Sequence, residues 1–195
     1  MPDPTSTAVP VPFRWQEPTS LLRLRWGGYR PRLLGGLLLI VAGGTAVAGG
    51  GATSPFATAL LFLGSAAHIV GWSVLPAAGW RRIWALIPST LAMWFMLTGP
   101  GWLAILALPY AGWLLVRHRP IASYPTVAFV IAGAFIVARL FPSYSAMLAA
   151  LGIMAGVMFL SSLAARAVHI AQAQARRMRR LRRGRKSSLS QVRPL

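Results

Sequence analysis

Few side chains in this sequence could take part in catalysis or ligand binding, and His68 is the strongest candidate among them. Ser65 lies three residues before His68, so on a helix the two side chains share one face. A serine beside a histidine is the pairing of nucleophilic catalysis, in which the imidazole takes the hydroxyl proton. Side chains on one helical turn seldom aim at a shared substrate, and the sequence has no Gly-x-Ser-x-Gly turn. We therefore favour a packed, hydrogen-bonded His68, with a polar pore or cavity as the alternative.

Arg139 is the second charged candidate within an apolar stretch. Its long side chain can reach the headgroup region from a helix end, or it can face inward and attract an anionic solute. The chain has only two acids, Asp3 and Glu17, against 20 Arg and Lys. This composition excludes carboxylate-based glycoside hydrolysis, and the sequence lacks phosphate-loop and zinc-protease motifs. With no cysteine and three dispersed histidines, we expect neither a metal site nor a cofactor.

Long apolar runs must position these residues, because 56% of the chain is hydrophobic and only 11% is charged. A helix needs about 20 mostly apolar residues to cross about 30 Å of hydrocarbon. Prolines lie at most boundaries of the runs, whereas Pro88 and Pro109 lie inside runs and are expected to kink them. The expected spans are residues 33–50, 56–75, 83–98, 101–116, 124–140 and 143–165.

Positive charge alternates between successive connections, which predicts the orientation. With six spans and a cytoplasmic N-terminus, 19 of the 20 Arg and Lys lie inside and only Arg139 lies outside. The sequence thus predicts an all-α fold, a polytopic transmembrane helix bundle of about six spans with both termini cytoplasmic. The preference for Arg over Lys, 19 to one, is typical of a GC-rich genome, so we expect a bacterial cytoplasmic (inner) membrane.

Three regions are expected: a disordered, basic leader at 1–32, a transmembrane domain at 33–170 and an Arg-rich tail at 171–195. The tail should extend the last helix to Gly184 and bind anionic lipid at the membrane surface. An acidic protein partner is an alternative; nucleic acid or the ribosome is less favoured, because no aromatic residue interleaves the charges. The expected lipid-binding residues are Arg176, Arg177, Arg179, Arg180, Arg182, Arg183, Arg185 and Lys186.

Two further patterns concern packing. Gly152 and Gly156 form a GxxxG pair, for which we favour close contact within the bundle over a homo-oligomer or a membrane-protein partner. The six residues from Leu75 (LPAAGW) recur from Leu108 (LPYAGW), which raises an internal duplication as an alternative to the ordinary enrichment of Pro, Gly and Trp at interfaces.

Taken together, these patterns favour a non-enzymatic integral membrane protein, a structural or accessory subunit with a basic lipid-binding tail. The alternative is a small transporter or channel for a neutral or anionic solute, supported by His68, the two internal prolines and the repeat. An intramembrane enzyme rests on Ser65 and His68 alone.

Overall fold

The computed structural model describes residues 17–21, 27–49 and 56–191. Within these ranges it also describes the side chains, except at residue 49 and after Leu181. The α-helices are α1 (Tyr29–Gly49), α2 (Ala57–Val74), α3 (Gly79–Phe95), α4 (Ala107–Val116), α5 (Val127–Leu140) and α6 (Met147–Gln191). Short 3-10 helices are η1 (Pro18–Leu21), η2 (Met96–Thr98), η3 (Pro100–Leu106), η4 (Ile121–Thr126) and η5 (Tyr144–Ala146). The described residues contain no strand, so the all-α prediction is confirmed.

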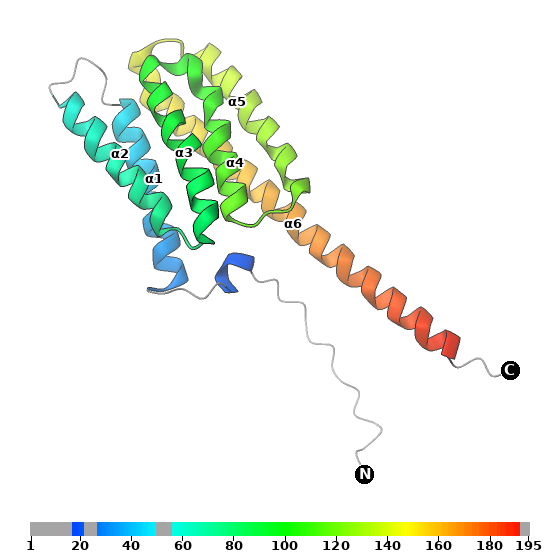
Figure 1. Ribbon diagram of the computed structural model, residues 1–195. Helices are drawn as coiled ribbons and strands as arrows, with labels where there is room; N and C mark the ends of the chain where they lie inside the picture. Colours follow the sequence, from blue (N-terminus) through cyan, green and yellow to red (C-terminus); the bar gives the residue numbers. More distant parts are fainter. Residues whose placement is uncertain (1–16, 22–26, 50–55, 192–195) are drawn as a thin grey trace.

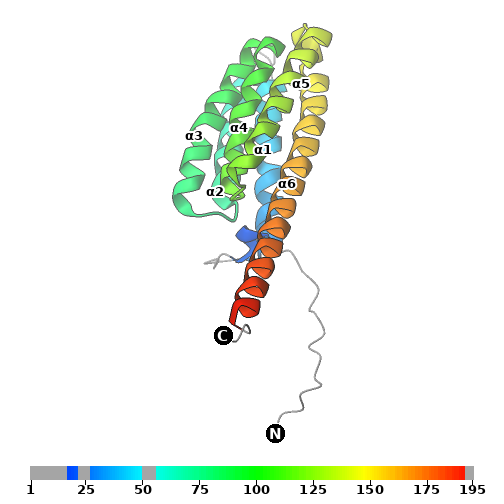
Figure 2. The ribbon, with the colours of Figure 1, turned by 90° about the vertical axis from the view of Figure 1, so that its right-hand side faces the viewer.

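The helices run alongside one another as a bundle, in which α1 packs with α2 and α5 packs with α6, and the last part of α6 extends beyond the bundle (Figures 1 and 2). Within the described part of the chain, four helical stretches are long and apolar enough to cross a membrane: Tyr29–Ala48, Ala57–Val74, Ile121–Leu140 and Tyr144–Leu181. The described residues are therefore all-helical and include four candidate membrane-spanning helices. Helix α3 and the stretch Pro100–Val116 are shorter, and the count of six spans stays a prediction.

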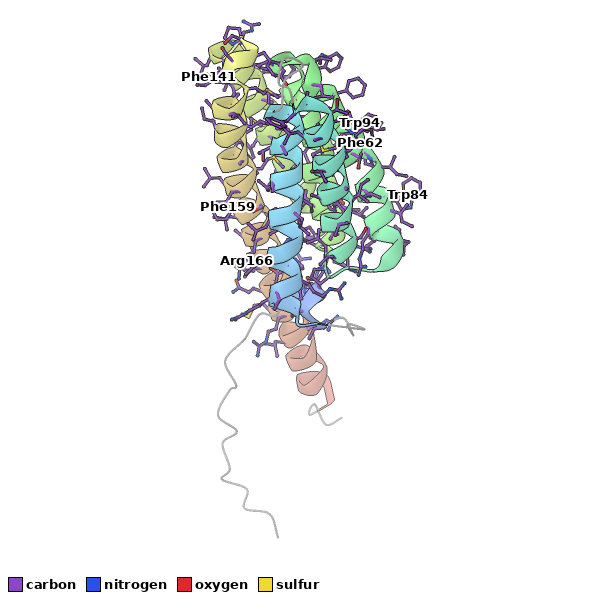
Figure 3. All side chains as sticks on the ribbon, turned by 90° about the vertical axis from the view of Figure 1, so that its left-hand side faces the viewer. Phe62, Trp84, Trp94, Phe141, Phe159 and Arg166 are labelled. Atoms are coloured by element: carbon purple, nitrogen blue, oxygen red, sulfur yellow. The ribbon has the colours of Figure 1, made fainter. Side chains whose placement is uncertain are left out.

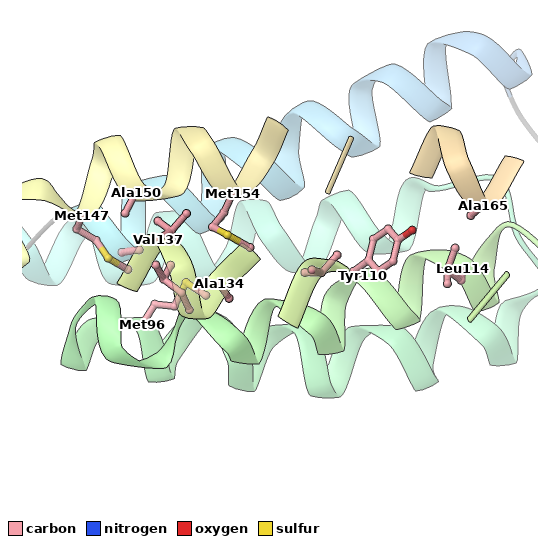
Figure 4. Packing of buried hydrophobic residues seen from close by; sticks show 12 residues of the cluster. Met96, Tyr110, Leu114, Ala134, Val137, Met147, Ala150, Met154 and Ala165 are labelled. Carbon is pink, nitrogen blue, oxygen red and sulfur yellow. The ribbon is translucent and has the colours of Figure 1, made fainter. Parts of the chain in front are cut away.

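The outer surface of the bundle is apolar. Phe62, Trp84 and Phe159 project outward from α2, α3 and α6 (Figure 3), and each is more than 60% exposed. Inside, one buried hydrophobic cluster runs along the bundle and includes Tyr110 and Leu114 of α4, Val137 of α5 and Met154 of α6 (Figure 4). Since large exposed apolar surfaces are rare on soluble monomers, this surface fits contact with lipid.

The tightest helix contact joins α1 and α2 through glycines seven residues apart on each helix. A Cβ atom on Gly43 would lie 2.4 Å from the carbonyl oxygen of Gly64. One on Gly36 would lie 2.9 Å from the carbonyl oxygen of Gly71. Only glycine lets two backbones approach this closely.

Gly152 and Gly156 do not make such a contact. Both are exposed on α6, and nothing lies within 4 Å of a Cβ atom built on either. The prediction that they pack inside the bundle is wrong, because α6 turns its Met154 face inward and its GxxxG face outward. Their role as a face for another chain stays a prediction.

The repeat takes two different conformations. In the first copy Leu75 ends α2 and the helix restarts only at Gly79, whereas the second copy lies entirely inside α4. Pro109 lies in the first turn of α4, where the missing backbone N–H costs little stability. Pro88, by contrast, lies in the interior of α3. The two copies are therefore not a structural repeat.

The leader and the tail also differ from expectation. Residues 1–16 and 22–26 lie outside the described residues, but Thr19 is fully buried against the bundle and Glu17 pairs with Arg117 and Arg119. Helix α6 continues past Gly184 to Gln191. Its 45 residues correspond to roughly 68 Å, more than twice the thickness of the hydrocarbon layer.

Candidate functional site

His68 lies in a buried polar group that we call the histidine cluster: His68, Trp72, Ser89 and the carbonyl of Ile40. Nδ1 of His68 lies 3.1 Å from the Ile40 carbonyl oxygen, and Nε2 lies 2.8 Å from Oγ of Ser89. The indole N–H of Trp72 donates to both Nε2 of His68 (3.2 Å) and Oγ of Ser89 (2.9 Å). The cluster joins α1, α2 and α3.

The hydrogen bonds determine the tautomer of His68. The indole can only donate and the carbonyl can only accept, so Nε2 is unprotonated and Nδ1 carries the proton. The Ser89 hydroxyl then donates to Nε2 while its oxygen accepts from Trp72. Each polar side-chain atom of the cluster has a partner, as a stable buried network requires.

Ser65, the predicted partner of His68, has a different neighbour. Its hydroxyl accepts a hydrogen bond from the indole N–H of Trp94 on α3, at 3.1 Å. Ser65 and His68 are both buried on the same face of α2, as the spacing predicted, but each binds α3 separately. Sequence reasoning missed Ser89, because a contact across 21 residues leaves no mark in local spacing. It also missed Trp72, which could have been found, because residues four apart share one face of a helix.

A cavity of about 130 Å³ lies beside the histidine cluster, between α1, α3 and α6. His68 and Ser89 reach its wall, but most of its lining is aliphatic or thioether, including Met93, Met96 and Met158. Such a wall offers an ion or a polar solute few hydrogen bonds.

Arg139 does not face this cavity. It lies exposed in the last turn of α5, at the end of the bundle opposite η1. There a cation also interacts favourably with the helix dipole. The structure thus separates Arg139 from His68 and Ser65.

The other end of the bundle holds what we call the arginine cluster: Arg117, Arg119 and Arg166 around Glu17. The Glu17 carboxylate lies 3.0 Å from Arg117 and 3.0 Å from Arg119, which follow α4, and 3.8 Å from Nε of Arg166 on α6. Arg166 lies toward the end of the bundle from which the long part of α6 emerges (Figure 3). A carboxylate from the leader therefore joins two distant segments.

Arg117 is held on several sides. Its guanidinium donates to the hydroxyl of Thr19 at 2.9 Å and to that of Tyr29. It also lies 5.4 Å from the centre of the Trp113 ring, a cation–π distance. These contacts keep a buried cation in place, and they explain why Thr19 and η1 are packed against α4.

Arg119 connects the arginine cluster to His169 in the middle of α6. One of its nitrogens binds Glu17, and another donates to Nδ1 of His169 at 3.0 Å. Burial lowers the pKa of the Arg119 guanidinium, and the carboxylate of Glu17 opposes that shift. Glu17 thus offsets part of the cost of burying this guanidinium.

The turn that presents both arginines ends α4 in a Schellman motif. The N–H of Arg119 binds the carbonyl of Leu114 at 3.0 Å, and that of His118 binds the carbonyl of Leu115 at 3.1 Å. His118 occupies the left-handed position with φ +54°, where glycine is usual. No glycine marks this turn, so the sequence offered no signal for it.

Beyond the arginine cluster, a hollow of about 390 Å³ lies between Pro120 and α6. It is lined by His169, Arg176, Arg177 and Arg180 among others. Three residues of the predicted lipid-binding tail are therefore gathered at one place, beside Arg119 through the shared His169. Arg179 is exposed, and the side chains of Arg182, Arg183, Arg185 and Lys186 lie outside the description.

No group of three or more His, Cys, Asp or Glu that could hold a metal occurs among the described residues. The chemistry available at the arginine cluster is the binding of an anion, because guanidinium groups match carboxylate and phosphate geometry. Comparison of the chain with models of known protein families, with curated proteins and with solved structures gives no match.

Proposed function

We propose that the chain is a non-enzymatic integral membrane protein, a structural or accessory subunit that holds anionic lipid at its arginine-rich end. The observation that carries the proposal is the charge pattern of α6. No charged residue occurs from Met147 to Ala165, and the chain from Arg166 onward is rich in arginine. In this arrangement six spans place both ends on the cytoplasmic side of the inner membrane of a bacterium.

Six spans require α3 and the stretch Pro100–Val116 to cross the membrane although they are short. A seven-residue 3-10 helix, η3, supports this, because its rise of about 2.0 Å per residue lengthens the stretch. Because the chain has no cysteine, single cysteines report topology without background.

The topology test uses three single-cysteine variants and a membrane-impermeant maleimide on intact cells. We expect Gly101→Cys and Ser145→Cys to react from outside and Leu21→Cys only in inverted vesicles. If α3 and α4 do not cross, Gly101→Cys reacts only in inverted vesicles, whereas Ser145→Cys is unaffected. That result would replace six spans by four.

The lipid role is tested by changing Arg176, Arg177 and Arg180 together to Gln. Each cation near an anionic surface contributes about 1 kcal/mol. We expect native mass spectrometry of the detergent-extracted protein to show less retained phosphatidylglycerol, with the difference shrinking as salt increases. Arg139→Gln is the matched control at the other end of the bundle. Equal retention in the triple variant and this control would contradict the lipid role of the tail.

A hydrolytic enzyme is the second candidate, because Ser89 and His68 come from different helices and lie 2.8 Å apart. The Ile40 carbonyl orients the imidazole as the third group of a triad would. Against it, Ser89 is 1% exposed, and the Trp72 N–H occupies the same Nε2 that would take the serine proton. A fluorophosphonate probe that labels the wild type but not Ser89→Ala would support the enzyme.

We do not favour a transporter. The cavity at His68 is mostly apolar and Arg139 is exposed at the opposite end from the arginine cluster. Neither feature supports a polar path through the bundle.

A further inference from the structure

Positive charge predominates in the arginine cluster. Three guanidinium groups surround one carboxylate, a formal surplus of two charges. The side chains of Arg117 and Arg119 are 8% and 6% exposed, so water screens them little. Glu17 is the only acid among the described residues, since Asp3 lies outside them. The positive charge that exceeds the charge of Glu17 also attracts other anions to this site.

The depth of the cluster indicates where such an anion is found. Arg166 is the twentieth residue of α6, and 20 helical residues span roughly 30 Å, the thickness of the hydrocarbon layer. If the apolar part of α6 crosses the membrane, Arg166 lies at the level of the lipid phosphates.

The cluster is open on one side. Arg166 is 51% exposed, whereas the Glu17 carboxylate beneath it is 16% exposed. The neighbouring hollow at His169 and Arg176 continues the positive surface away from the bundle. A phosphate can therefore approach Glu17 past Arg166.

We propose that Arg117, Arg119 and Arg166 form a site for the phosphate of an anionic lipid headgroup, and that Glu17 is its internal, displaceable occupant. This inference rests on the proposed membrane insertion and names the ligand class of one end of the bundle. A phosphodiester carries the same single charge as a carboxylate and accepts the same paired guanidinium hydrogen bonds. When the phosphate enters, Glu17 and η1 leave together, while Arg117 keeps the hydroxyl of Tyr29 and the ring of Trp113.

The competition between Glu17 and a lipid phosphate depends on the fact that Glu17 is covalently linked to the site. Glu17 lies on the same chain as the site, so its effective concentration is in the millimolar range or above. Anionic lipid reaches comparable local density only at the membrane surface, which makes displacement depend on lipid composition. The cluster thus couples the position of η1 to the content of anionic lipid.

A spin label on Leu21→Cys, a residue 70% exposed in η1, reports whether this segment is docked. The full chain is placed in nanodiscs of phosphatidylcholine with increasing phosphatidylglycerol. We expect an immobilised label in pure phosphatidylcholine and a mobile label as phosphatidylglycerol increases. Glu17→Gln should give a mobile label at every composition and raise the apparent affinity for phosphatidylglycerol, measured by native mass spectrometry, about tenfold.

Three comparisons decide the outcome. Arg119→Gln should abolish the lipid-dependent release, and Arg139→Gln, which removes the same charge at the far end, should not change it. Inorganic phosphate in pure phosphatidylcholine nanodiscs should leave the label immobile at millimolar concentration; release by phosphate but not by lipid overturns the lipid assignment. A label that stays immobile at all compositions, with unchanged lipid affinity in Glu17→Gln, shows that Glu17 is a structural ion pair only.

A second label separates this inference from the proposed function. Ala167→Cys places a spin label beside Arg166, and collision with oxygen and with a water-soluble nickel chelate measures its depth. A headgroup depth with no release of η1 overturns only the displacement. A label far from the bilayer overturns the membrane placement of α6 itself.

Discussion

The histidine cluster and the arginine cluster both contain buried polar side chains, but the partners that satisfy these side chains differ. The histidine cluster is neutral, and its hydrogen bonds all end on its own three helices. The arginine cluster is charged, and Glu17, in the segment before the first helix of the bundle, is its counter-ion. The difference teaches that a closed network fixes helix positions, whereas a network with surplus charge leaves room for exchange.

The largest effect should come from forcing apart the helices that carry the histidine cluster. In Gly43→Ala the new methyl group would meet the backbone of Gly64 and His68, so the helices must separate and the Ile40–His68 hydrogen bond must lengthen. We expect a loss of more than about 3 kcal/mol, seen as a lower melting temperature in detergent by circular dichroism. Gly35→Ala, with nothing within 4 Å, is the control and should melt no lower than the wild type.

Removing the imidazole should cost about 3 kcal/mol in His68→Ala, because Ser89 loses its acceptor and a cavity opens beside the existing one. Ser65→Ala, which breaks one hydrogen bond at a half-exposed Trp94, should cost only about 1 kcal/mol. Thermal unfolding followed by tryptophan fluorescence compares the two. Equal losses would show that the histidine cluster is not a unit.

Prediction from sequence succeeded where the signal is local and failed where partners are distant. Apolar runs placed the six α-helices, and the spacing of Ser65 and His68 placed both on the buried face of α2. No local pattern could pair His68 with Ser89, or Glu17 with arginines about 100 residues away. A count of charges offered one hint, since Glu17 is the only acid near any cluster of Arg.

The glycines show the same division. The GxxxG sequence on α6 is a local pattern, yet Gly152 and Gly156 are exposed and make no close contact with another described helix. The closest helix contact is made instead by Gly36 and Gly43, which are seven residues apart. Which small residues face a neighbouring helix depends on the rotation of each helix in the bundle. That rotation is decided by packing of the whole core and not by the spacing of two glycines.

Salt should distinguish the two clusters. Glu17→Gln leaves Arg117 and Arg119 without their carboxylate and should cost about 2 kcal/mol at low ionic strength. Added salt supplies anions and screens the exposed side of the site, so the loss should shrink at 0.5 M salt, roughly a 4 Å Debye length. Ser89→Ala, in the neutral cluster, should lose the same stability at both salt concentrations. Melting temperatures in a non-ionic detergent test this; a salt-independent loss in Glu17→Gln would contradict it.

The smallest effect should be a pH dependence at the turn that presents Arg117 and Arg119. Burial, and next the charge of Arg81, lower the pKa of His118, whose Nε2 is buried without a hydrogen-bond partner among the described residues. Because the pKa in the folded state lies below the unfolded value of about 6.5, protonation favours unfolding. The contribution of His118 is therefore complete above pH 6.5 and is lost as the pH falls below that value.

His118→Asn isolates this contribution, because asparagine tolerates the left-handed backbone at φ +54° and does not titrate. We expect the stability difference between wild type and variant to change by less than about 1 kcal/mol between pH 7.5 and 5, since His118 is only half-buried. The wild type should lose more stability than the variant on acidification, and subtraction removes the other histidines. If both curves fall in parallel, the pH response comes from another group, and the turn holds the two arginines independently of His118.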